Sequence, residues 1–150
     1  MPLQPPEEYH IHTPTPHVPN SRLPVLIYRS VLPLPPNEKE EEEDTAGSES
    51  RLNHPCSEEE GSPAFSAAGA ARQAIEANHW YYGGIFKSYW AHHFHSVTHE
   101  CYAVVAGRSR LLLGVGPLDG GVDEGGRKRE RNGVQVELGT GDVIVLPVST

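Results

Sequence analysis

Apolar and polar side chains alternate in short runs over the second half of the chain. In residues 134–138 every second position is valine or leucine, the pattern of a strand with one face in a core. Turn sequences that begin with glycine, at 107–109 and 139–142, separate such runs. Short strands at this close spacing, with no helix between them, predict an all-β fold, an antiparallel sandwich or barrel. We expect strands at 88–95, 100–106, 110–115, 134–138 and 143–146.

Two other elements precede this β-rich part. Residues 24–28 are a short apolar, β-prone run bounded by prolines, which predicts an edge strand within an extended, proline-rich arm over 1–34. Ser62-Pro63 is a helix start signal, because serine caps the first turn and proline fits the first helical position. Apolar and small side chains then recur at helical spacing, so we expect one helix over 63–77.

An acidic tract occupies residues 35–62. It contains ten acidic side chains against Lys39 and Arg51, so the whole net charge of −8 lies within it. Because it has almost no apolar side chains, it cannot bury enough surface to offset the entropy of ordering, and we interpret it as a disordered insertion. The rest of the chain balances ten acids with ten bases, which argues against a nucleic-acid partner that needs a concentrated basic face.

Other features restrict the cellular setting. The chain has no run of about 18 apolar residues for a membrane span. Cys56 and Cys101 are far apart in the sequence, which does not indicate a disulfide framework and fits a reducing compartment. The proline-rich, acidic N-terminus resembles neither a secretory signal nor a transit peptide. We therefore expect a cytoplasmic protein with no membrane partner.

Four histidines lie in the segment HHFHSVTHE, residues 92–100. On a strand, His93 and His95 would face the same side, roughly 6–7 Å apart along the chain. That spacing lets both imidazoles converge on one ion at about 2.0–2.2 Å from each nitrogen. Glu100 follows a short turn and can reach back with a carboxylate, so these three residues form a candidate metal site. The alternative is a solvated histidine-rich turn.

These residues carry a resemblance to a known family. The spacing of His93-x-His95, four residues to Glu100, then six to Gly107, resembles the first motif of the cupin superfamily, also described as RmlC-like. The sequence GDVIVLP, residues 141–147, is similar to the opening half of the second cupin motif. The sequence of these segments most resembles that of the YjlB-like single-domain cupins of bacteria and fungi.

The resemblance covers roughly residues 14–34 and 63–147 and implies a fold. It predicts a cupin-like antiparallel β-barrel or jelly roll over residues 63–150, with one packed helix outside it and an N-terminal arm. Two features depart from the family pattern. Lys87 stands where the first motif usually has glycine, and the second motif stops at Thr150, before the stretch that supplies a fourth histidine ligand.

From this departure we expect a C-terminally truncated chain with an incomplete barrel. An open barrel exposes unpaired strand edges, which favours instability or pairing with another chain, as in a homodimer. The resemblance implies a divalent metal ion (Fe, Mn, Zn or Ni) held by His93, His95 and Glu100, with a small-molecule ligand or substrate. It identifies no catalytic residue, and a metal-dependent enzyme is one hypothesis. The alternative is a non-catalytic small-ligand binding protein or an inactive truncated fragment.

Three further features are weaker candidates for a functional site. His10 and His12 repeat the histidine spacing, but they lie in the proline-rich arm and no carboxylate follows them. The basic run 127–131 sits between glycine-rich turns, where a solvated loop is the favoured interpretation. Cys101 alternates with Glu100 along the expected strand, so we interpret it as a small side chain on the opposite face.

Overall fold

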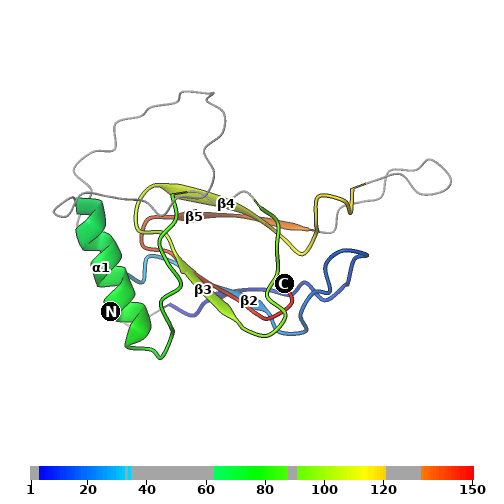
Figure 1. The fold of residues 1–150 in the computed structure, drawn as a ribbon, viewed down its shortest axis with the longest axis horizontal. Coiled ribbons are helices and arrows are strands. Elements are labelled where there is room, and N and C mark those ends of the chain that lie inside the picture. Colours follow the sequence, from blue (N-terminus) through cyan, green and yellow to red (C-terminus); the bar gives the residue numbers. More distant parts are fainter. Residues whose placement is uncertain (1–3, 33, 35–62, 88–90, 121–132) are drawn as a thin grey trace, which may run out of the picture.

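The computed structural model describes residues 4–32, 34, 63–87, 91–120 and 133–150. Within these residues the regular secondary structure is mostly β-strand, in antiparallel sheets, with one helix (Figure 1). The all-β prediction is therefore confirmed at this level. The acidic tract 35–62 and the basic run 127–131 lie outside the described residues. In chain order the elements are β1 Glu7–Tyr9, β2 Val25–Tyr28, α1 Pro63–Glu76, β3 Glu100–Ala103, β4 Arg108–Leu113, β5 Val134–Gly139 and β6 Val143–Leu146.

The strands form two separate sheets. The larger sheet has the order β1-β2-β6-β3, and every neighbouring pair is antiparallel. The smaller sheet consists of β4 and β5, which pair along their whole length from Arg108 opposite Gly139 to Leu113 opposite Val134. In the part of the chain that the structure describes, the two sheets do not close into a barrel.

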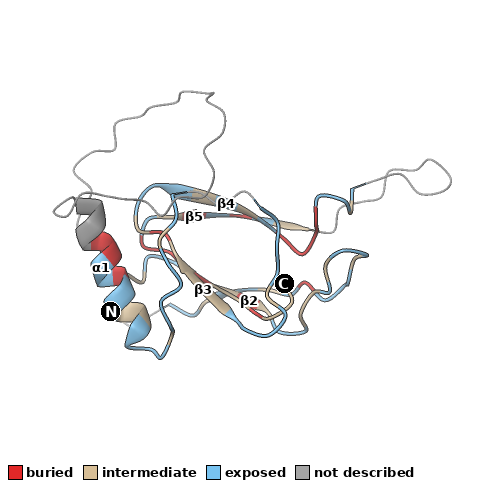
Figure 2. Ribbon diagram, viewed as in Figure 1, coloured by how far each residue is buried: buried red, intermediate tan, exposed pale blue. Residues whose placement is uncertain are grey.

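One hydrophobic core joins the two sheets. From the larger sheet, Val25, Ile27 and Ile144 are fully or almost fully buried, and Val136 and Leu138 of β5 join the same cluster. Figure 2 shows buried positions on strands of both sheets. Burying each such side chain contributes about 1.5–3 kcal/mol. The period-two pattern of residues 134–138 places valine and leucine inward and Gln135 and Glu137 outward, as a strand with one buried face requires.

Strand β2 corrects one prediction. Residues 24–28 were expected to form an edge strand, but β2 lies inside the sheet, between β1 and β6. Pro24 is compatible with this position because it precedes the first paired residue, so its missing N–H falls outside the ladder. The edge of the sheet on this side is β1, whose sequence Glu-Glu-Tyr gives no apolar signal.

The strand expected at 88–95 is also corrected where the structure describes it. Residues 91–99 adopt no regular secondary structure. A strand requires a continuous ladder with a partner. The carbonyl of His95 instead accepts a hydrogen bond from a distant segment, the N–H of Ser149, at 2.8 Å.

Helix α1 begins and ends close to its predicted limits. Pro63 occupies its first position, as the start signal predicts. Near its end the Asn78 side-chain amide donates to the Ala74 carbonyl at 2.9 Å. The helix lies beside the sheets (Figure 1), and one of its faces is covered, because three of its alanines are buried: Ala67, Ala68 and Ala71.

A buried carboxylate organises the turn between β5 and β6. Asp142 accepts hydrogen bonds from the N–H of Ser30 at 2.8 Å, the N–H of Gly139 at 2.9 Å and the Arg29 guanidinium at 2.9 Å. Burial by itself raises the pKa of Asp142. The hydrogen bonds from Gly139, Ser30 and Arg29 outweigh burial and hold this pKa below its ordinary value.

Arg29 extends this contact to three parts of the chain. Besides Asp142, it binds both carboxylate oxygens of Glu7 on β1, at 2.8 and 3.0 Å. It also donates to the backbone carbonyl of Glu137 on β5 at 2.7 Å. One guanidinium therefore links β1, at the edge of the larger sheet, to the smaller sheet, in addition to the ladder that pairs β1 with β2.

Candidate metal centre

The carboxylate of the candidate site is positioned by the larger sheet. Glu100 is the first residue of β3 and lies opposite Leu146 of β6. It shares a face of β3 with Tyr102, which packs against the hydrophobic core. The Glu100 carboxylate therefore stands at the end of the strand, on the side that faces the core. Its side chain is 37% exposed, so solvent reaches it.

The two histidines come from the irregular segment that precedes β3. The ring centroids of His93 and His95 are 5.2 Å apart, with the ring planes at 70°. The Nδ1 atom of His93 lies 3.0 Å from the Ala91 carbonyl oxygen. A carbonyl oxygen only accepts, so this contact requires the proton on Nδ1 and puts the ring lone pair of His93 on Nε2.

The three side chains meet in space. The His95 Nε2 and Glu100 Oε2 atoms are 3.8 Å apart. One ligand atom from each of His93, His95 and Glu100 lies within 4.8 Å of the other two. Two atoms that bind one ion at about 2.1 Å are at most about 4.2 Å apart, so small side-chain rotations bring this group to metal-binding distances. The convergence predicted from the spacing is confirmed, and this group can hold a metal ion.

The two histidines converge for a different reason than the one predicted, because their backbone is irregular. The prediction placed His93 and His95 on one face of a strand, whereas the structure brings them together from a loop. The site is also open, because the His95 side chain is 42% exposed. If this group held an ion, three protein ligands on an open surface would leave coordination positions for water or a small ligand.

Cys101 does not belong to this group. It lies opposite Val145 and faces the other side of the sheet from Glu100, in agreement with the alternation expected from the sequence. Burial, and secondarily the charge of Glu100, raises the pKa of the Cys101 thiol to about 11. The thiol therefore keeps its proton at neutral pH, which makes it a weak nucleophile.

The second histidine pair is a different arrangement. The rings of His10 and His12 have centroids 5.1 Å apart, and His10 Nε2 lies 3.4 Å from a carboxylate oxygen of Glu8. The carboxylate near this pair belongs to Glu8, which precedes both histidines in the sequence. Among the described residues, His93, His95 and Glu100 are nevertheless the one set of three such side chains that comes within ligand distance.

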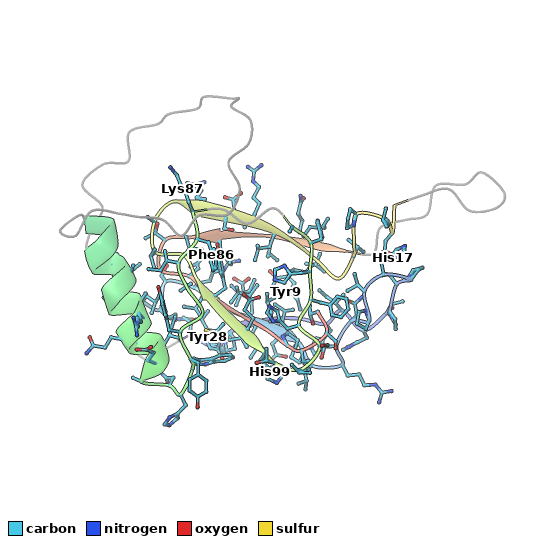
Figure 3. The ribbon with its side chains drawn as sticks, viewed as in Figure 1. Tyr9, His17, Tyr28, Phe86, Lys87 and His99 are labelled. Carbon is cyan, nitrogen blue, oxygen red and sulfur yellow. The ribbon has the colours of Figure 1, made fainter. Side chains whose placement is uncertain are left out.

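The last residues of the chain contact the loop of this site. Residues 147–150 follow β6 and lie beside the loop that leads into β3 (Figure 1). The N–H of Val148 donates to Nδ1 of His99 at 2.9 Å. Figure 3 labels His99, which directly precedes β3. No local pattern signals a contact between residues 49 positions apart.

Comparisons with models of known protein families, with characterised proteins and with solved structures gave no significant match. The cupin resemblance therefore remains a prediction that rests on the motif spacing. No helix in the described part of the chain is long and apolar enough to cross a membrane.

Proposed function

We propose that this chain is a metal-binding protein of the cupin type, in which His93, His95 and Glu100 hold one divalent ion. The observation that carries the proposal is the closeness of the three ligand atoms, all within 4.8 Å of one another. The match between this group and the spacing of the first cupin motif supports it. The type of donor is a second support, because two imidazole nitrogens and one carboxylate oxygen suit a first-row transition ion.

The types of ligand atom also restrict which metal ions the site favours. Calcium and magnesium prefer oxygen ligands, so the two imidazoles favour Fe, Mn, Zn or Ni instead. With one carboxylate, a bound divalent ion leaves a net charge of +1 at the site. An ion with open positions and this charge attracts a small anionic or carbonyl-bearing molecule and polarises it as a Lewis acid. We propose such a molecule as the ligand or substrate.

Calorimetric titration with Zn(II), Mn(II) and Fe(II) tests metal binding. The wild-type chain should bind one ion, and His95→Ala should weaken binding at least about tenfold because two ligands cannot enclose the ion. His92→Ala is the matched control, since it removes an exposed neighbouring imidazole outside the group. Binding should also weaken as the pH falls, because imidazole ligates only in its neutral form.

Two results would contradict the proposal. If His95→Ala binds as tightly as wild type, the ion sits elsewhere, and His10 with His12 becomes the first place to look. If the wild-type chain binds none of the three ions, the group is a solvated pair of histidines beside a carboxylate.

A further inference from the structure

We propose that residues 147–150, here called the C-terminal strap, position the metal-binding loop, and that His99 is the positioning residue through which the strap acts. This inference rests on the proposed function, because it concerns the same site. His99 is distinct from the three proposed ligands and is not a member of the group that can hold the ion.

Two hydrogen bonds join the strap to the loop. The N–H of Ser149 donates to the carbonyl of His95 at 2.8 Å, and the N–H of Val148 donates to the His99 ring at 2.9 Å. The bonds fall at the two ends of the segment 95–99. This segment begins at one proposed ligand, His95, and ends directly before another, Glu100.

The strap is itself held in a defined shape. Pro147 is buried at the end of β6, and its carbonyl accepts a hydrogen bond from the N–H of Thr150 at 3.3 Å. Ser149 has a φ of +72°, which closes this turn in the left-handed region. Two consecutive N–H groups, those of Val148 and Ser149, are in this way presented to the loop.

The strap restrains a loop that has no regular secondary structure of its own. Residues 96–99 are exposed and have no regular secondary structure, so no strand ladder fixes the separation of the two ligands. Glu100 is fixed by the ladder of β3, whereas His95 depends on the loop. Preorganising a ligand before the ion arrives removes an ordering cost from binding, and partners that orient ligands are typically worth 10–100-fold in metal affinity.

The His99 ring accepts rather than donates at Nδ1. A backbone N–H points at this atom, so Nδ1 carries a lone pair and the neutral ring keeps its proton on Nε2. This geometry defines a conservative replacement. Asparagine places its Oδ1 acceptor at the same branch of the side chain, whereas phenylalanine keeps the ring size and removes the acceptor.

The test compares Zn(II) affinity by calorimetry for wild type, His99→Phe, His99→Asn and a chain lacking residues 148–150. We expect His99→Phe to weaken binding about tenfold and His99→Asn to stay within about twofold of wild type. Removing residues 148–150 should weaken binding at least as much as His99→Phe, since it removes both strap bonds. Adding His99→Phe to the shortened chain should cause no further loss, because the partner of His99 is already gone. ¹⁵N NMR of the wild-type His99 ring should show Nδ1 without a proton.

The outcomes separate a failure of the positioning role from a failure of the proposed metal site. Wild-type affinity in His99→Phe, no rescue by His99→Asn, or additive losses in the combined variant would overturn the positioning role and leave the metal site intact. A wild-type chain that binds no metal would overturn the proposed function and the positioning role together. Circular dichroism of each variant, matching wild type, ensures that the affinities compare folded chains.

Discussion

Replacing Asp142 with alanine should be one of the most destabilising single changes in the described part of the molecule. Only 8% of the Asp142 side chain is exposed, and it accepts three hydrogen bonds. Asp142→Ala leaves the N–H groups of Ser30 and Gly139 without their acceptor and removes the buried partner of Arg29. Hydrogen bonds to a charged group contribute about 1.5–3 kcal/mol each, and removing one member of a buried ion pair costs about 3–5 kcal/mol.

The exposure of Arg29 sets the expected value at the lower end of this range. Its side chain is 38% exposed, so water can solvate the guanidinium after the carboxylate is lost. We expect a loss of about 3 kcal/mol in the free energy of unfolding. With an m-value of about 1.5–2 kcal/mol/M, the urea midpoint should fall by about 1.5–2 M. Urea unfolding followed by circular dichroism measures this shift.

Glu137→Gln is the matched control. Its carboxylate pairs with Arg108 and Arg110, whose side chains are 81% and 80% exposed. Such surface pairs contribute about 0–1 kcal/mol, and the Glu137 backbone carbonyl that binds Arg29 is unchanged in the variant. If Asp142→Ala costs no more than this control, water replaces the Asp142 carboxylate and the reasoning about its three bonds is refuted.

Two further predictions concern stability. Because the folded-state pKa of Asp142 is lowered, its contribution is complete above the unfolded-state pKa of about 3.9 and is lost as the pH falls through the lower folded-state pKa. The difference in urea midpoint between wild type and Asp142→Ala should therefore shrink below about pH 4, and a constant difference down to pH 2 would contradict this. Gly114→Ala should cost about 2–4 kcal/mol, since φ is +80° and the new methyl group meets the Ile11 side chain. Gly107→Ala, with φ +73° and open space, should cost only about 1–2 kcal/mol, and equal losses would show that the contact with Ile11 is relieved.

The sequence predicted those elements whose signals are local. Strand β6 has the expected limits, and the period-two run of β5 packs its valine and leucine into the core. Helix α1 begins at the predicted proline. The short strand β1 was missed, because Glu-Glu-Tyr has no apolar pattern and is held by Arg29, a contact between residues 22 positions apart.

At the candidate site, too, the local spacing was informative and the long-range contacts were not. The spacing of His93, His95 and Glu100 was sufficient to predict that they converge, although the strand assigned to the two histidines was wrong. Val148 and Ser149 donate hydrogen bonds to this loop, and single-sequence periodicity carries no information about such distant partners. For the same reason the sequence predicted strands but not their division into two sheets or the inner position of β2.

Anomalous diffraction from crystals grown with Zn(II) would test the central claim most directly. We expect one strong peak about 2.0–2.2 Å from a ring nitrogen of His93, a ring nitrogen of His95 and a carboxylate oxygen of Glu100. The same peak should be absent from crystals of His95→Ala grown under the same conditions. A peak at His10 and His12 with none at Glu100, or no ordered zinc in the wild-type crystals, would contradict the assignment of this site.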